Sequence, residues 1–185
     1  TSLTLHSTYS VQDAPFKEVC NDYADASLSI HFLESSAQAD LYRGEGRLHE
    51  WYEKVGFECD FLHYGSPSER IVECVPKYRG VLLVHNCEIT EQDIEVLTDH
   101  FSAPISFALC PRSNAYISGV EPRSVELLRK AGANINICIG TDSLSSNWSL
   151  SMVEELKMFR NIPLAELLQW ATINGAKALG IADKY

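Results

Sequence analysis

The stretch Gly80-Val-Leu-Leu-Val-His85, followed by Asn86-Cys-Glu-Ile-Thr90-Glu-Gln-Asp93, decides the fold class. Its first part is a short apolar, β-branched run that is typical of a buried strand. Thr90 can accept a hydrogen bond from a free N–H group at the start of a helix, and Ile94, Leu97 and Phe101 then fall on one helical face. A buried strand that leads into a helix predicts an α/β protein with a parallel sheet covered on both faces.

The same alternation extends in both directions along the chain. After this unit, strands are expected over 105–110 and 134–140, and helices over about 122–131, 150–160, 163–170 and 172–180. A loop is expected to hold Pro111, Gly119 and Pro122, with Pro122 near the first turn of the helix that follows. Before this unit, residues 2–6 and 27–32 predict strands, a helix is expected near 14–24, and residues 36–79 mix helix with loop.

The composition disfavours several classes of protein and partner. The 185 residues are 45% apolar and 22% charged, which is typical of a single folded domain. Fifteen Lys and Arg against 25 Asp and Glu give a net charge of −10, which disfavours nucleic acid and membrane surfaces as partners. No window approaches the apolar run of about 18 residues that a membrane span needs, and the N-terminus has no signal-peptide pattern, so a cytoplasmic location is expected. The six cysteines form no C-x-x-C pair and are expected to be reduced and mostly buried.

Polar residues stand at the ends of the predicted strands. They are His6, His31 with Glu34 three residues later, His85, and Asp142. Because parallel strands bring their C-terminal ends to one edge of a sheet, these side chains are expected to converge. Imidazoles and carboxylates together suit a metal site with an adjacent acid or base. Taken singly, Glu34 could instead be a solvated loop charge, and Asp142 could cap the turn that follows it.

Five short segments carry a family resemblance. They are His6-Ser-Thr-Tyr9-Ser10, His31-Phe-Leu-Glu34-Ser35, Val84-His85-Asn86, Cys110-Pro-Arg-Ser-Asn114 and Gly140-Thr-Asp142-Ser143-Leu-Ser-Ser-Asn147, in this order, with Ala171-Thr-Ile-Asn174-Gly175-Ala176-Lys-Ala-Leu-Gly180 closing the chain. Together they resemble the metal-dependent amidohydrolase superfamily, in particular its cytosine, guanine and adenosylhomocysteine deaminase and chlorohydrolase branch. The resemblance implies an α/β fold that is a partial TIM (β/α)8 barrel, comprising about strands four to eight with their helices.

The resemblance also implies a role for individual residues. His31 and Asp142 match metal ligands, and Asp142 in addition accepts the proton of the attacking water. Glu34 matches a residue that contacts substrate and moves protons, and His85 matches one that orients the water or polarises the substrate. His6 matches a substrate-binding histidine, and the loop Arg112, Ser113 and Asn114 is expected to line the substrate pocket.

Part of the family pattern is missing. Relatives take two further metal ligands from an H-x-H pair on the first barrel strand, and these 185 residues contain no H-x-H. Residues 1–185 are therefore expected to be the C-terminal part of the barrel, with the N-terminal half and the small β-sandwich domain absent, and to be inactive alone. Five strands cannot close an eight-stranded barrel, so self-association or pairing with the missing barrel half is expected. Gln38 replaces an acid common in relatives, and Ser7-Thr8 stands where a proline is frequent.

The function implied for the intact parent is hydrolysis by metal-activated water. The expected reaction is deamination, or dechlorination, of a small-molecule heterocyclic substrate, with one divalent metal ion as cofactor. Imidazole and carboxylate ligands favour zinc, with iron as the alternative, over magnesium or calcium. A second hypothesis is a metal-free binding or scaffolding protein derived from such a barrel.

Overall fold

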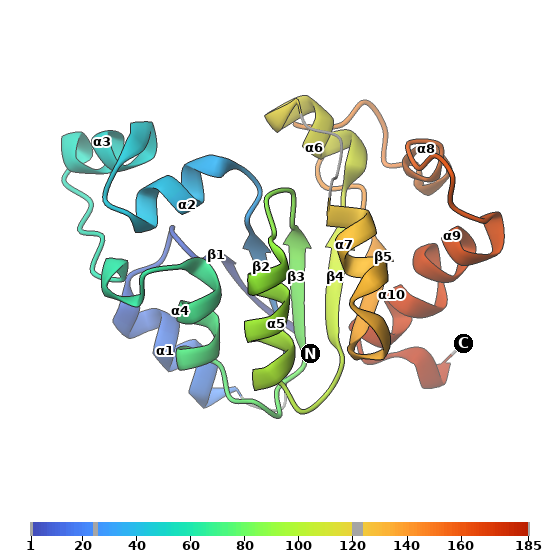
Figure 1. Cartoon of the computed structure of the whole chain (residues 1–185), viewed down its shortest axis with the longest axis horizontal. Helices are drawn as coiled ribbons and strands as arrows, with labels where there is room; N and C mark the ends of the chain where they lie inside the picture. Colours follow the sequence, from blue (N-terminus) through green and yellow to red (C-terminus); the bar gives the residue numbers. More distant parts are fainter. Residues whose placement is uncertain (1, 24–25, 120–123, 185) are drawn as a thin grey trace.

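The computed structural model describes residues 2–23, 26–119 and 124–184. Its centre is a five-stranded sheet in which every neighbouring pair is parallel and the spatial order follows the sequence (Figure 1). The strands are β1 (Ser2–Ser7), β2 (Ser27–Phe32), β3 (Val81–His85), β4 (Ile105–Leu109) and β5 (Ile135–Ile139). The predicted α/β class and parallel sheet are confirmed, and each predicted strand is found within two residues of its expected bounds. The expected cover on both faces is not found, because burial alternates along β2 and β3 and leaves one of their faces only partly covered.

Helices connect successive strands. Between β1 and β3 lie α1 (Asp13–Asp22), α2 (Ser36–Tyr42), α3 (Gly46–Val55), a short 3-10 turn (Leu62–Tyr64) and α4 (Pro67–Cys74). Between β3 and β5 lie α5 (Glu91–His100), α6 (Pro111–Ser118), α7 (Ser124–Lys130) and a second 3-10 turn (Gly132–Asn134). After β5 come α8 (Met152–Leu156), α9 (Leu164–Ala171), α10 (Ile173–Ala178) and a third 3-10 turn (Ala182–Lys184). None of the described helices is long and apolar enough to cross a membrane.

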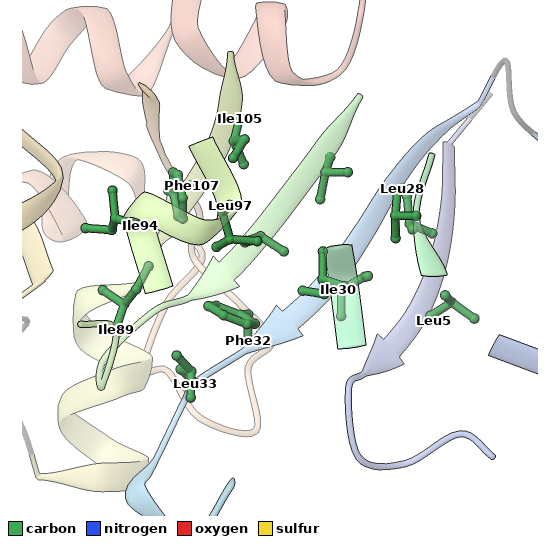
Figure 2. Close-up of a cluster of buried hydrophobic side chains, with 14 of the residues drawn as sticks. Leu5, Leu28, Ile30, Phe32, Leu33, Ile89, Ile94, Leu97, Ile105 and Phe107 are labelled. Carbon is green, nitrogen blue, oxygen red and sulfur yellow. The ribbon is translucent and has the colours of Figure 1, made fainter. Parts of the chain in front are cut away.

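Strand β2 shows how the sequence separates the core from the site. Leu28, Ile30 and Phe32 alternate with less buried neighbours and belong to the hydrophobic core. Figure 2 shows Phe32 of β2 and Phe107 of β4 close to Leu97 of α5. Because successive side chains of a strand point to opposite faces, His31 lies on the face that does not pack against this core.

The N-terminus of α5 follows the sequence-based prediction. Thr90 accepts a hydrogen bond from the Asp93 N–H, and Asp93 in turn accepts one from the Thr90 N–H, which makes a capping box. Ile94 and Leu97 are buried as the helical spacing predicts. The start of the helix is therefore fixed by two local hydrogen bonds.

Replacing Thr90 with alanine is expected to lower the free energy of unfolding by about 1 kcal/mol, because the Asp93 N–H loses its acceptor. Urea denaturation measures this change. Thr90→Ser retains the hydroxyl and is the matched control, for which we expect a smaller loss. Equal losses in the two variants would show that the cap does not account for the effect.

The expected loop after β4 is wrong over 111–118, which form α6. Pro111 occupies the first turn of this helix, where its missing N–H costs no intrahelical hydrogen bond. Gly119 ends the helix in the left-handed conformation, with φ of 64°. Pro111 and Gly119, which were expected to lie in a loop, thus mark the start and the end of α6. Pro122 lies outside the described residues.

The cysteines agree with the expected reduced state. All six are free thiols, and five of them are buried, whereas Cys59 is partly buried. Burial raises the pKa of Cys138 to about 12, which keeps this thiol protonated and unreactive at neutral pH.

Candidate functional site

The C-terminal ends of the strands carry the predicted site residues to one edge of the sheet. In Figure 1 the arrowheads of β3 and β4 point toward the end of the sheet where α6 lies. The register pairs Ser7 of β1 with His31 of β2, and Phe32 of β2 with His85 of β3. The last residues of neighbouring strands therefore lie at nearly the same level, as the parallel topology predicts.

Three imidazoles form a row across this edge. The ring centroids of His6 and His31 are 5.1 Å apart, and those of His31 and His85 are 4.7 Å apart. The Nδ1 atom of His6 lies 2.7 Å from the Ser10 hydroxyl oxygen, and this histidine is exposed. The central ring, His31, is partly buried between the other two. Histidines that are far apart in sequence are thus brought into direct contact.

Glu34 and Asn114 flank the ring of His85. The ring is 1% exposed, and its Nδ1 hydrogen-bonds the Asn114 side-chain oxygen at 2.9 Å. Because that oxygen can only accept, Nδ1 carries the proton in this arrangement, and Nε2 faces a Glu34 carboxylate oxygen at 3.7 Å. His31, Glu34 and His85 each offer one ligand atom, and these atoms lie within 4.8 Å of one another. The three side chains form a compact nitrogen and oxygen donor set.

Asp142 stands just beyond β5 and is held by serines. One carboxylate oxygen accepts hydrogen bonds from the Ser113 hydroxyl at 2.5 Å and the Ser146 hydroxyl at 3.0 Å. The other accepts from the Ser143 N–H at 2.7 Å. Burial acts to raise the pKa of Asp142, but these hydrogen bonds and the nearby His85 outweigh it and lower the pKa. The carboxylate is therefore ionised at neutral pH and fixed in orientation.

Three of these residues have an unusual backbone conformation. The φ angles of His6, His85 and Asp142 are 60°, 78° and 57°, which lie in the left-handed region. Such conformations cost residues other than glycine about 1–3 kcal/mol each and persist where the surrounding structure holds them. Each turns the chain at the end of its strand.

His31 is held in its neutral form. Burial, followed by the neighbouring His85 and His6, lowers the pKa of His31 to about 4, and the Asp142 carboxylate only partly opposes this effect. At neutral pH the ring therefore has a free nitrogen lone pair, which is the form that binds metal ions.

In the metal-free protein, the lowered pKa of His31 predicts a loss of stability on acidification. The unfolded imidazole, with a pKa of 6.5, takes up a proton more readily than the folded one, with a pKa of about 4. Stability is therefore expected to fall between those two values, with no contribution from His31 above 6.5 and no further loss below about 4. Urea denaturation at pH 7, 5.5 and 4 should show a smaller fall in His31→Gln than in the parent chain. The same fall in both proteins would contradict the prediction.

The remaining predicted residues lie around this group. Ser113 and Asn114 are fully buried in α6, and their side chains contact Asp142 and His85. The Arg112 guanidinium donates to the Ser149 hydroxyl and stacks over the exposed Trp148 ring at 5.1 Å from the ring centroid. Arg112 is therefore the member of this expected pocket-lining loop whose side chain extends outward.

The sequence did not predict the roles of two residues at the site, Ser146 and Gln38. Ser146 belongs to a serine-rich stretch, 143–146, which was noted only as part of the segment around Asp142 and was given no role of its own. Gln38, noted as a departure from the family pattern, is buried and accepts the Leu33 N–H at 2.9 Å. Leu33 has a φ of 46°, so Gln38 holds the turn that leads to Glu34. A neutral amide is sufficient for this acceptor role.

The arrangement combines the parts of an acid–base hydrolytic site. It places a neutral imidazole, an ionised carboxylate and a second carboxylate beside a histidine, all at the end of a rigid sheet. Such a set can hold a cation, accept a proton from water and return a proton to a leaving group.

Comparisons with known proteins agree with this arrangement. The model of the amidohydrolase family matches residues 1–185. The chain is 30% identical to the adenosine deaminase of Helicobacter pylori over 190 residues, which cover 97% of this chain and 45% of that protein. It is 27% identical to the 5-methylthioadenosine/S-adenosylhomocysteine deaminase of Desulforudis audaxviator, with 97% of this chain and 39% of that protein covered. The chain thus spans less than half the length of these relatives.

Solved structures give the same result. The crystal structure of Helicobacter pylori aminofutalosine deaminase superposes with a TM-score of 0.79 at 30% identity, covering 97% of this chain and 46% of that chain. Escherichia coli guanine deaminase shares the fold, with a TM-score of 0.65 at 18% identity over 90% of this chain and 35% of that chain. Because the family model extends over all 185 residues, the chain belongs to the amidohydrolase family.

Proposed function

We propose that the intact protein containing this chain is a metal-dependent hydrolase that deaminates a heterocyclic small molecule. In this reaction water adds to the ring carbon that carries the amino group, the carbon–nitrogen bond breaks, and ammonia leaves. The deaminases among the relatives support this reaction class, and chloride remains the alternative leaving group. An aminopurine nucleoside is the substrate class that we propose, because the two relatives described above are named for adenosine and for 5-methylthioadenosine and S-adenosylhomocysteine.

The convergence of His31, Glu34, His85 and Asp142 at one sheet edge is the observation that carries the proposal. His31 and His85 have adjacent rings, Glu34 faces His85, and the charge of Asp142 acts on the pKa of His31. These residues lie at or just after the C-terminal ends of three strands and are separated by up to 111 positions in the sequence (142 − 31). A structural role for each one alone would not require them to meet.

The donor set fits a divalent metal ion such as zinc, or alternatively iron. Imidazole nitrogen and carboxylate oxygen are the ligands that these metals prefer, and the neutral state of His31 leaves its lone pair available. We propose His31 and Asp142 as the ligands supplied by this chain. Asp142 lies outside the compact group of His31, Glu34 and His85, but its charge acts on the His31 ring. When bound, the ion would lower the pKa of water toward about 7 and supply a nucleophile at neutral pH.

The protein side chains divide the proton transfers among them. Asp142 is ionised and accepts the proton of the attacking water. Glu34 contacts the substrate and passes this proton on to the departing nitrogen, so that the group leaves as ammonia and both carboxylates return to their starting state. His85 keeps its Nδ1 proton through Asn114 and directs Nε2 toward the reacting water or the substrate ring. His6 and Arg112 border the site and are proposed to contact the substrate.

We further propose that the five strands occupy places four to eight of an eight-stranded barrel. The share of the relatives that this chain covers, 45% or less, supports a partial barrel, and the order of the motifs in the family resemblance is the basis for places four to eight. Strands β1 and β5 are the two edges of the described sheet. Their backbone N–H and C=O groups would then pair with the first and third strands of the barrel, or with another copy of the chain. The remaining ligands of the metal would come from the N-terminal half.

Ammonia release by the intact protein tests the proposed function. The zinc-loaded protein is incubated with a panel of aminopurine nucleosides, aminopyrimidines and chlorinated triazines, and ammonia and chloride are measured. We expect ammonia from at least one aminopurine nucleoside, and no turnover by the 185-residue chain alone. A zinc-loaded intact protein that binds these compounds without releasing either product would instead support a binding or scaffolding role.

A further inference from the structure

We propose that Glu155 is a positioning residue that fixes the orientation of Asp142 without touching it. The catalytic consequence of this inference rests on the proposed function, whereas the structural link does not. Glu155 lies in α8, and its side chain is 0% exposed. Its role follows from the two groups that it contacts and from where those groups lie relative to Asp142.

Glu155 joins two segments that surround the site. One carboxylate oxygen accepts the backbone N–H of Arg112, in the first turn of α6, at 3.1 Å. The other accepts the side-chain N–H of Asn147, in the loop after β5, at 2.6 Å. The first N–H groups of a helix have no intrahelical partner, so the carboxylate also satisfies one end of α6. A single buried side chain thus holds α6 against the β5 loop.

Each of these contacts lies one residue away from a group that binds Asp142. Arg112 precedes Ser113, and Asn147 follows Ser146, and these two serines donate to the same oxygen of Asp142. The Asn147 side chain also donates to the backbone oxygen of Thr141, at 2.7 Å, directly before Asp142. Loss of Glu155 would therefore release both segments that supply the hydroxyl donors of Asp142.

Burying the Glu155 carboxylate costs free energy because the group loses its hydration. Burial, with a smaller contribution from the charge of Asp142, raises the pKa of Glu155, although the hydrogen bonds from Arg112 and Asn147 and the charge of Arg112 act in the opposite direction. Among the described residues, no Lys or Arg forms an ion pair with Glu155. Burying a carboxylate without an ion pair lowers the stability of the fold. The hydrogen bonds that join α6 to the loop after β5 explain why this carboxylate is present.

A double-mutant cycle with Asp142 tests the inference without any metal. Glu155→Ala, Asp142→Ala and the double variant of the 185-residue chain are unfolded in urea with chelator present. We expect Glu155→Ala to be less destabilising when Asp142 is already absent, by about 2- to 100-fold in the unfolding equilibrium constant. Repulsion between the two carboxylates would give the opposite sign, so the sign separates the two explanations.

Two controls keep the cycle interpretable. Glu154→Ala removes the neighbouring carboxylate, which pairs with Lys157, and its effect is expected to be additive with Asp142→Ala. Glu155→Gln retains an oxygen for the Arg112 N–H but places an NH2 group against that of Asn147, so it should show the same coupling with a smaller loss of stability. If Glu155→Ala fails to fold, Glu155→Gln replaces it in the double-mutant cycle. Additive effects for Glu155, or coupling of the opposite sign, would overturn the proposal.

A zinc titration of the same variants adds the functional readout. Substitutions behind a metal ligand typically cost about 10- to 100-fold in metal affinity. In the otherwise unchanged 185-residue chain, we expect Glu155→Ala to lower the zinc affinity by this amount. In the Asp142→Ala variant, we expect the same substitution to have no effect on the zinc affinity. Coupling in urea with unchanged zinc affinity would support the positioning role of Glu155 and count against Asp142 as a metal ligand. The two proposals can therefore fail separately.

Discussion

Asp142→Asn is expected to reduce ammonia release by the intact protein by about 10²- to 10⁴-fold, while the fold is retained. The amide has nearly the same shape as the carboxylate, and its oxygen can still accept the Ser143 N–H. It cannot accept a proton from water, and it brings no negative charge to the metal. Initial rates of ammonia release measure the loss of activity, and circular dichroism on the same sample measures whether the fold is retained.

Asp99→Asn is the matched control for the loss of one negative charge. Asp99 is exposed on α5, away from the strand ends, and its substitution is expected to leave the rate unchanged. If Asp142→Asn kept a rate close to that of the parent protein, Asp142 would not be the proton acceptor. A loss of rate accompanied by unfolding would instead be assigned to structure, and Ser146→Ala would then test the orientation of the carboxylate in a folded protein.

Arg70→Met is expected to give the largest loss of stability among these variants, about 2–5 kcal/mol, from one lost buried hydrogen-bond donor and the lost stacking of the cation. The guanidinium is fully buried and donates to the backbone oxygens of Thr8 at 2.7 Å and Val11 at 3.0 Å. Methionine fills much of the space but leaves the Val11 oxygen without this donor, at about 1–3 kcal/mol, whereas the Thr8 oxygen keeps the Tyr42 hydroxyl as a donor. It also removes the stacking of the cation on Phe16 and Phe61. Urea denaturation measures the change.

The same substitution is expected to disturb the loop that follows His6. Thr8 and Val11 belong to the connection between β1 and α1, so their release loosens the segment that carries His6 at its start. Arg47→Met is the control, because Arg47 is exposed on α3 and should change the free energy of unfolding by less than about 0.5 kcal/mol. Equal effects at the two arginines would show that the buried hydrogen bonds of Arg70 contribute little.

The sequence was sufficient to predict the sheet and the convergence of the site. Each strand is an apolar run with its own periodicity, and His31, His85 and Asp142 follow from the rule that parallel strands share one C-terminal edge. Those inferences depend only on local pattern and topology. The assignment of roles to individual residues came from the resemblance, and the experiments above are needed to test it.

The supporting contacts could not be predicted because they depend on tertiary structure. Glu155 meets Arg112 across 43 positions, and Arg70 meets Thr8 across 62, and neither pair leaves a periodic signal in the sequence. Helix α6 was missed because Pro111 and Gly119 are typical both of loops and of helix boundaries. Between β2 and β3, helices α2 and α3 pack on one another, whereas α4 packs mainly on α5. These contacts leave no simple periodic signal, so only a mixture of helix and loop was predicted there.

Zinc titration of the metal-free intact protein, with ammonia release from an aminopurine nucleoside recorded at each step, is the most direct test of the account. We predict that the rate rises in proportion to added zinc, reaches a plateau near one equivalent and is abolished by a chelator. We also predict that His31→Ala shows neither zinc binding nor ammonia release at that stoichiometry. Steady ammonia release from the chelator-treated protein, or full zinc binding by His31→Ala, would contradict the claim that the ends of these strands form a single metal-dependent hydrolytic site.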